Sequence, residues 1–273
     1  MELRKIPDVS AYLPRIDGKD ADADFRNDVP KNSDDIYAVC DGDQVVGLAC
    51  IRAEGFLYVY IFAEHRHKGY GSFAAQAAEQ QACAGPVTSL STAYDSRNEI
   101  AAGFAQKRGF IKKFSTSVMV YPGEKFDIPA LPVRKHQDAD FPEAYTLSSE
   151  AFHRMRLETG LFPDSVPYPA DEEARRYCAE TADERYVYML DQEIIGCAHL
   201  DGAEIDNVAI KIPHQGKGHG KAFVKFLVNE ILDQKIGTPF LYCLVANRKA
   251  RHVYDSLGFV ETACNVYAVK NLP

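Results

Sequence analysis

The sequence predicts an α/β protein with mixed sheets, in which one fold occurs twice along the chain. The chain has 273 residues, which is longer than one ordinary domain. The stretch HQGKGHGK at His214–Lys221 has a partial copy, HRHKGYGS at His65–Ser72, which lies 149 residues earlier. With this offset, thirteen residues are identical in the 74 columns from Tyr37 to Phe110. Segments with strand-like and helix-like apolar spacing alternate around both stretches, which is typical of α/β domains.

The second half of the chain shows ten segments in the order β-α-α-β-β-β-α-β-α-β. In sequence they are residues 131–135, 139–155, 171–181, 185–190, 193–200, 204–212, 221–235, 239–246, 247–258 and 265–270. The first helix has apolar residues at helical spacing, and the second has acidic residues in its first turn. Asp191–Gln192 separates two β-rich runs and predicts a hairpin.

After the glycine stretch, residues 221–235 predict an amphipathic helix. Its apolar side consists of Phe223, Phe226, Leu227, Ile231 and Leu232. Residues 239–246 predict a buried strand, and residues 247–258 predict a helix closed by a glycine. The first half repeats this order with shorter helices, and its opening helices are expected to be trimmed.

A boundary between the two copies is expected near Tyr121–Pro132. There a glycine and three prolines interrupt the strand and helix pattern. We therefore predict two domains, residues 1–125 and 126–273.

Composition excludes several classes of protein. The net charge of −8 argues against a general nucleic-acid binder, which needs a basic face to meet phosphates. No apolar run approaches the roughly 18 residues of a membrane span, and the first residues do not resemble a signal peptide. The seven cysteines are scattered and never spaced CxxC, which favours buried thiols in a reduced compartment over disulfides, a metal site or a catalytic cysteine. We expect a cytoplasmic protein without metal.

The glycine stretch points to an anion. A strand that ends in a glycine-rich turn and opens a helix directs free backbone N–H groups toward one point, and the helix dipole adds positive potential. Lys217 and Lys221 suit a phosphate-bearing ligand. A Walker loop is excluded because GKGHGKA is one residue short and ends in Ala222. A dinucleotide fingerprint is excluded because its third glycine would fall at Phe223.

QGKGHG after VAIKIP resembles the acyl-CoA loop of GCN5-related N-acetyltransferases (GNATs), written Q/R-x-x-G-x-G/A between a strand and a helix. NRKARHVYDSLGF resembles a second signature of that family, through Asn247, Ala250, Tyr254 and Gly258–Phe259. The two signatures are 32 residues apart in both halves, from Gln215 to Asn247 and from Arg66 to Asn98. The resemblance implies a tandem GNAT member with acetyl-CoA as co-substrate.

The resemblance assigns the cofactor contacts of the second half. Backbone amides of the loop would hold the CoA pyrophosphate, and the strand edge at Ile210, Lys211 and Ile212 would pair with the pantetheine arm, with the Ile210 amide directed at the thioester carbonyl. The loop residues are Gln215, Gly216, Lys217, Gly218, His219, Gly220 and Lys221. Asn247 would cap its helix and contact the CoA arm.

The chemistry needs an acid and a base. The resemblance gives Tyr254 the role of protonating the departing thiolate, or of donating a hydrogen bond to its sulfur. Glu204 stands where some family members carry a general base, and Asp206 is the alternative because it shares that face of the strand. Without a catalytic role, Tyr254 would be an aromatic side chain packed on its helix, and Glu204 and Asp206 would be exposed charges near the start of a strand. His199 and His219 are expected to be structural.

The first half departs from this pattern. The offset places Gly55 opposite Glu204, Ala105 opposite Tyr254 and His67 opposite Gly216, while Gly69 and Asn98 remain. We expect a degenerate, mainly structural copy that either binds CoA without turnover or shapes the acceptor site.

The expected reaction is transfer of an acetyl group from acetyl-CoA to a primary amine of a small molecule or peptide, in the second half, by direct attack. The alternative is a non-catalytic acyl-CoA-binding or sensing protein. A weaker option is a longer acyl group or a hydroxyl acceptor. The segment Phe141–Thr181 is expected to shape the acceptor site through Glu158, Asp164, Asp171, Glu172 and Glu173, although a solvated helix face explains these charges equally well. Monomer and homodimer both stay open.

Overall fold

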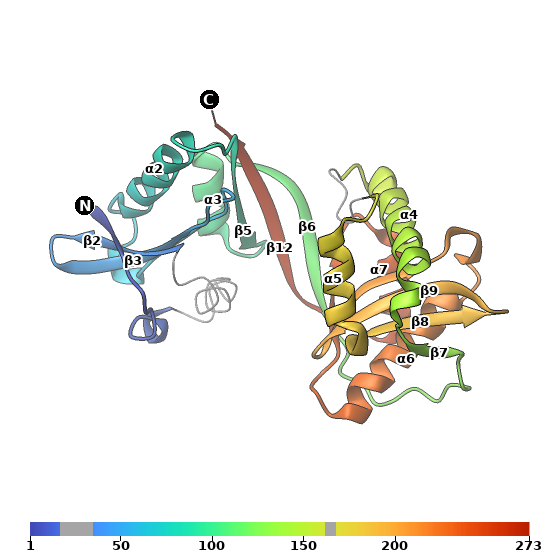
Figure 1. Ribbon diagram of the computed structural model, residues 1–273. Coiled ribbons are helices and arrows are strands. Elements are labelled where there is room, and N and C mark those ends of the chain that lie inside the picture. Colours follow the sequence, from blue (N-terminus) through green and yellow to red (C-terminus); the bar gives the residue numbers. More distant parts are fainter. Residues whose placement is uncertain (17–34, 162–167, 273) are drawn as a thin grey trace. The chain divides into compact units, whose positions relative to one another are not determined.

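The computed structural model describes residues 1–16, 35–161 and 168–272. Their contacts group into two compact units (Figure 1). The first unit contains Met1–Ser115 and Cys264–Pro273, and the second contains Thr116–Ala263. The boundary between residues 125 and 126 stays a prediction.

The second unit contains a mixed sheet with the strand order β6-β11-β10-β9-β8-β7. The strands are β6 (Ile111–Val120), β7 (Val133–Lys135), β8 (Arg185–Leu190), β9 (Glu193–Asp201), β10 (Glu204–Ile210) and β11 (Phe240–Leu244). The β10–β11 pair is parallel, and β7–β8, β8–β9, β9–β10 and β6–β11 are antiparallel. The β8–β9 hairpin turns at Asp191 and Gln192, which both have positive φ as two-residue hairpin turns require.

Helices cover both faces of this sheet. They are α4 (Phe141–Thr159), α5 (Glu172–Glu180), α6 (His219–Gln234) and α7 (Arg248–Leu257). On one face, Leu227 and Ile231 of α6 pack with Ile195 and Ile205 of the sheet. On the other face, Leu147 of α4 belongs to a smaller buried cluster. The apolar side predicted for α6 is confirmed at Phe223, Leu227 and Ile231, whereas Phe226 and Leu232 are only partly buried.

The first unit contains an antiparallel sheet in the order β1-β2-β3-β4. Its strands are β1 (Glu2–Lys5), β2 (Ile36–Asp41), β3 (Gln44–Ile51) and β4 (Leu57–Ile61). A further strand, β5 (Ser89–Asp95), and the helices α2 (Tyr70–Cys83) and α3 (Glu99–Lys107) complete the pattern. The trimmed opening helices fall largely on residues 17–34, which lie outside the described residues.

The last strand of each unit comes from the other half of the sequence. Residues 265–271 of β12 (Val260–Asn271) pair with β5, so the strand predicted at 265–270 joins the first unit. Residues 116–120 of β6 pair with β11 in the second unit. The repeat therefore builds two copies of one fold that exchange their final strands.

β11 is less buried than predicted. Leu241 and Cys243 point into the core, but Tyr242 between them is 49% exposed, because only one face of the strand is covered. In the described ranges, no helix is long and apolar enough to cross a membrane.

Candidate functional site

Two neighbouring strands separate in each unit. β10 and β11 pair only at Glu204 and Phe240, and the corresponding strands of the first unit meet through one isolated bridge between Phe56 and Ser91. A bulge between Asp206 and Ala209 bends β10, with Asn207 at a φ of 51°. Beyond these pairs, the facing edges of the strands are open to a ligand.

The first residue of the glycine loop braces the loop against the strand end. Nε2 of Gln215 donates a hydrogen bond to the carbonyl oxygen of Ile210 at 2.8 Å. Nε of Arg66 donates to the carbonyl oxygen of Ile61 at 2.9 Å in the first unit. Both side chains are thus engaged with backbone. The amide of Gln215, expected to contact the cofactor, donates instead to the carbonyl oxygen of Ile212 at 3.2 Å, as the amide of Arg66 does to Ala63 at 3.3 Å.

Two different structural features explain why the second loop contains glycines. Gly216 and Gly218 have φ values of 74° and 89°, in the left-handed region that favours glycine. Gly220 has ordinary φ, and a Cβ there would lie 3.6 Å from Ile210. In the first unit His67 adopts a φ of 62° in place of Gly216, so the loop keeps its course despite the substitution.

The loop fits a phosphate group. α6 begins after Gly218 without a side-chain cap, and a Cβ on Gly216 or Gly218 would meet nothing within 4 Å. Lys217 and Lys221 are exposed beside these open backbone groups. Free N–H groups, the helix dipole and two cations favour an anion of the size of a pyrophosphate.

The predicted strand edge is shorter than expected. β10 ends at Ile210, and Ile212 already begins a short 3-10 turn that contains Pro213. The amide of Lys211 donates to the carbonyl oxygen of Ile195 at 2.8 Å, and its side chain pairs with Glu193 at 2.6 Å. The amide and the side chain of Lys211 therefore both bind other groups of the protein rather than a ligand.

Tyr254 of α7 is partly buried and its ring packs against Phe259, with 5.7 Å between centroids. Burial raises the pKa of the phenol above its usual range, and Cys243 and Asp206 add to the shift. The phenol is therefore protonated at neutral pH and available as a hydrogen-bond donor.

Glu204 and Asp206 project from one face of β10. Burial raises the pKa of Glu204, and the charges of Asp206 and Asp201 raise it further. Nδ1 of the buried His199 lies 3.9 Å from Asp206, and its Nε2 lies 3.3 Å from Glu184. Asp206 is the largest cause of a raised pKa at His199, so the histidine is an electrostatic neighbour of the carboxylates rather than only a core residue.

Asn247 caps α7 as predicted. Its side-chain oxygen accepts a hydrogen bond from the amide of Ala250 at 3.2 Å. Asn98 does the same for the amide of Ala101 at 2.9 Å in the first unit. His219 lies beside Tyr188, with 3.3 Å between Nδ1 and the hydroxyl oxygen.

Several of the acidic residues expected at the acceptor site cap a helix, complement a helix dipole or form an ion pair. Asp171 caps α5 through the amide of Ala174 at 2.7 Å, and Glu158 pairs with Lys249 at 2.8 Å. Glu172 and Glu173 occupy the first turn of α5, where they complement the helix dipole. Asp164 lies outside the described residues.

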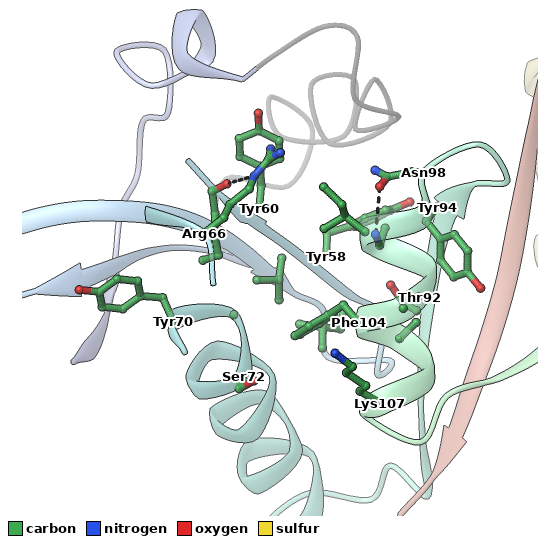
Figure 2. A pocket seen from close by; sticks show the side chains of 18 of the residues that line it. Tyr58, Tyr60, Arg66, Tyr70, Ser72, Thr92, Tyr94, Asn98, Phe104 and Lys107 are labelled. Atoms are coloured by element: carbon green, nitrogen blue, oxygen red, sulfur yellow. Dashed lines mark hydrogen bonds between the residues drawn. The ribbon is translucent and has the colours of Figure 1, made fainter. Parts of the chain in front are cut away.

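A cavity of about 490 Å³ lies in the first unit, between the separated strands and α2 and α3 (Figure 2). It adjoins the HRHKGYGS loop, and Arg66, Tyr58 and Phe104 are among its lining residues. Ala105, which stands where the second unit has Tyr254, also lines it. A cavity here is compatible with the expectation that the first half binds CoA without turnover, and Ala105 in place of a tyrosine was the sequence signal for the open space.

The family model for "Acetyltransferase (GNAT) family" matches residues 4–110 and 144–259. The [ribosomal protein bS18]-alanine N-acetyltransferase of Escherichia coli K12 is 26% identical over 127 residues, which cover 46% of this chain and 78% of that protein. The spermidine N(1)-acetyltransferase of Vibrio cholerae is 30% identical over 96 residues, covering 33% of this chain and 52% of that enzyme.

Among solved structures, a tandem GNAT protein from the clavulanic acid biosynthesis pathway aligns with a TM-score of 0.60 at 14% identity, over 87% of this chain and 82% of that one. At this identity the likeness concerns the fold, and it extends over both units. Since the family model covers most of the chain in two separate matches, the protein belongs to the GNAT family of acetyltransferases, as a tandem member.

Proposed function

We propose that the protein transfers an acetyl group from acetyl-CoA to a primary amine and that the second unit performs this chemistry. One observation supports the choice of unit. The second unit combines the glycine loop with the protonated phenol of Tyr254 and the carboxylates of Glu204 and Asp206. The first unit has Ala105 and Gly55 at the positions of the phenol and Glu204.

Acetyl-CoA supplies a thioester when it is bound. The amides of residues 216–221 hold its pyrophosphate, as the start of α6 without a side-chain cap suggests. The amide of Gln215 does not take part, because it donates to the carbonyl oxygen of Ile212 at 3.2 Å. Successive N–H groups of a strand alternate in direction, and the Lys211 amide is bonded to β9. The Ile210 N–H therefore faces the opening toward β11, where it donates to the thioester carbonyl oxygen.

The remaining residues move protons. Glu204, with its raised pKa, takes a proton from the ammonium acceptor, directly or through water. The amine nitrogen then bonds to the acetyl carbon and the carbon–sulfur bond breaks. Tyr254 donates a proton or hydrogen bond to the sulfur, and the second proton that the nitrogen loses on becoming an amide passes through water to the thiolate or back to the Tyr254 phenol. Asp206 stands beside Glu204 as the alternative base, and its negative charge favours a cationic acceptor.

The acceptor class is a primary amine on a small molecule or a peptide. The two relatives act, by their names, on the alanine of a ribosomal protein and on spermidine, which both present amino groups. The carboxylates on β10 suit such a cationic group.

A second candidate function, acyl-CoA binding without turnover, is supported by the cavity of the first unit. Its volume of about 490 Å³ falls within the range of about 300–1,000 Å³ typical of ligand sites. This unit keeps the brace of Arg66 and the cap of Asn98 while it lacks the phenol.

One experiment separates the two functions. Purified protein is incubated with acetyl-CoA and a panel of primary amines, and release of CoA thiol is measured for the wild type, Glu204→Gln and Tyr94→Phe. We expect amine-dependent release that falls about 10²-fold in Glu204→Gln. It should persist in Tyr94→Phe, which removes a phenol from the first unit. Binding of acetyl-CoA with no release for any amine would contradict the enzyme and favour the sensing function.

A further inference from the structure

A row of charged side chains crosses one face of the sheet in the second unit. Arg185 of β8, His199 of β9 and Asp206 of β10 are partners in the strand register, so their side chains lie side by side. Glu204 comes two residues before Asp206 and points to the same face, opposite Asp201. The proposed base therefore has His199 as a diagonal neighbour on the adjacent strand.

His199 lies between two carboxylates. Only 4% of its side chain is exposed, and its Nδ1 lies 3.9 Å from a carboxylate oxygen of Asp206. Its Nε2 lies 3.3 Å from a carboxylate oxygen of Glu184, whose side chain is 54% exposed in the short turn before β8. Each ring nitrogen thus faces a negative charge, which favours the imidazolium with a proton on both nitrogens.

Helix α5 and strand β8 supply the other polar groups around His199. The ring of Tyr177 meets the imidazole edge to face, with 6.3 Å between centroids. The guanidinium of Arg185 lies 5.1 Å from the centre of the Tyr177 ring, and its Nε donates to Oγ1 of Thr181 at 2.8 Å. Burial raises the pKa of the Cys178 thiol on α5, so this thiol adds no charge at neutral pH.

The two carboxylates prevail over the arginine. Asp206 is the largest cause of the raised pKa of His199, and Glu184 adds to it, against burial and the charge of Arg185. Helix α4 meets this sheet through apolar residues such as Leu147. His199 therefore keeps its positive charge to a higher pH than an ordinary histidine.

The first copy of the fold is built without this pair. The offset of 149 residues places Cys50 opposite His199 and Leu57 opposite Asp206. Cys50 and Leu57 are both buried, with exposures of 1% and 2%. Burying a charged pair costs desolvation that apolar residues avoid. The histidine and the aspartate occur in the copy that carries Glu204, which ties them to its chemistry rather than to the fold.

Glu204 needs a positive neighbour. After burial, the charges of Asp206 and Asp201 raise its pKa, whereas the charge of His199 lowers it. A protonated Glu204 has no capacity to accept the proton of an ammonium acceptor. A cation beside these carboxylates favours the ionised form, which is the form that works as a base.

We propose that His199 is a positioning residue of the reaction: as an imidazolium between Glu184 and Asp206, it offsets the negative charge around Glu204 and keeps this base ionised. Glu184 sets the charge of the histidine from the surface. The proposal rests on the proposed function, since it takes Glu204 as the base of the second unit. The proton that Glu204 accepts leaves to water, and His199 keeps both of its own protons.

Carboxyl NMR measures this effect without any acceptor. The protein is labelled at the side-chain carboxyl groups of glutamate, and the resonance of Glu204 is assigned by its absence from Glu204→Gln. In His199→Gln the titration midpoint of Glu204 should move to higher pH, because a positive neighbour is lost. An unchanged midpoint in this variant would overturn the proposal.

Glu184→Gln gives the sharper test, because its side chain is half exposed and the variant leaves the core intact. Acting directly, the loss of a negative charge would move the midpoint of Glu204 to lower pH. Acting through His199, the same loss weakens the imidazolium and moves the midpoint to higher pH. We expect the shift to higher pH, and no further rise when Glu184→Gln is added to His199→Gln.

Two other carboxylates serve as controls. Asp183→Asn removes an exposed carboxylate one residue from Glu184 and should leave the midpoint of Glu204 unchanged. Asp206→Asn should lower the midpoint, because Asp206 acts on Glu204 directly and more strongly than His199 does. A shift to lower pH in Glu184→Gln, as in Asp206→Asn, would overturn the role of the histidine.

Kinetics then link the effect to the reaction. The acidic limb of kcat/KM, from release of CoA thiol with the panel amine that reacts fastest, should shift with the midpoint in each variant and keep its alkaline plateau. A merely structural role of His199 would lower activity at every pH without moving the limb, and that result would overturn the proposal. If the midpoints shift as expected but no amine gives release of CoA thiol, the proposed function fails while the electrostatic link between His199 and Glu204 stands.

Discussion

The side chain of Gln215 folds back and donates a hydrogen bond from Nε2 to the carbonyl oxygen of Ile210, at 2.8 Å. Arg66, its counterpart 149 residues earlier, makes the same contact with Ile61 at 2.9 Å. A glutamine and an arginine thus make the same contact, which holds the glycine loop against the end of the strand. Each gives the carbonyl group at the end of the strand a hydrogen-bond donor.

Gln215→Ala should therefore loosen the loop, whereas Gln215→Arg should preserve it. Loss of this partly buried hydrogen bond is expected to cost about 1 kcal/mol in the free energy of unfolding, measured by urea denaturation. The dissociation constant for acetyl-CoA should rise roughly tenfold in the alanine variant and stay near the wild-type value in the arginine variant. An arginine variant as weak as the alanine variant would show that the glutamine has a role that Arg66 does not share.

Tyr254→Phe should lower kcat without weakening acetyl-CoA binding. The variant keeps the ring that packs on Phe259 and removes only the hydroxyl group. Loss of a positioned proton donor typically costs about 10²-fold or more. Stopped-flow or steady-state release of CoA thiol gives kcat, and calorimetry gives the affinity. An unchanged kcat would leave Tyr254 as a packed helix aromatic.

The pH dependence of kcat/KM should report Glu204. Its pKa is raised above the usual carboxyl range by burial and by the charges of Asp206 and Asp201. The base works when deprotonated, so activity should rise with pH through this raised pKa. Asp206→Asn removes a like charge, which lowers the pKa of Glu204 and should shift the acidic limb of the profile to lower pH.

A loss of activity across the whole pH range in Asp206→Asn, with no shift of the acidic limb to lower pH, would contradict this assignment and favour Asp206 itself as the base. Lys113→Gln, which changes one charge on the first unit, controls for an effect of net charge alone.

The sequence predicted the local structure of the second half well. The hairpin at Asp191 and Gln192 and the glycine that closes α7 were visible because turns and helix ends demand particular residues. The exchange of final strands was not predicted, because residues 265–270 have the same alternating pattern whichever strand they pair with. The roles proposed for Tyr254 and Glu204 came only from resemblance, since their positions along the chain say nothing about which residues meet.

The shape of the cavity in the first unit escaped prediction for another reason. Ala105 is an ordinary small helical residue, and the space it leaves depends on the residues packed around it, such as Phe104. The contact of the segment at Phe126 with Asn229 joins residues 103 positions apart, which no local pattern reveals.

Separating the halves at residue 125 should destabilise both. A fragment of residues 126–273 lacks residues 116–120, which pair with β11, and exposes residues 265–271, which pair with β5. Unpaired strand edges promote association with other chains. We expect the fragment to aggregate in size-exclusion chromatography, and coexpression with residues 1–125 to restore a soluble complex. A monomeric fragment with the thermal midpoint of the full chain would contradict the exchange.

Ala105→Tyr should fill the cavity of the first unit. It introduces the residue that the second unit has at the equivalent position, so the side chain is compatible with this helix in at least one copy of the fold. If the first unit holds acyl-CoA, calorimetry of the wild type should give two sites per chain, and the variant should give one. The thermal midpoint of the variant, compared with that of Ile111→Tyr at an exposed position, checks that the fold is intact. Two sites in the variant would show that the second ligand binds outside this cavity. One site in the wild type would show that the cavity does not bind acyl-CoA.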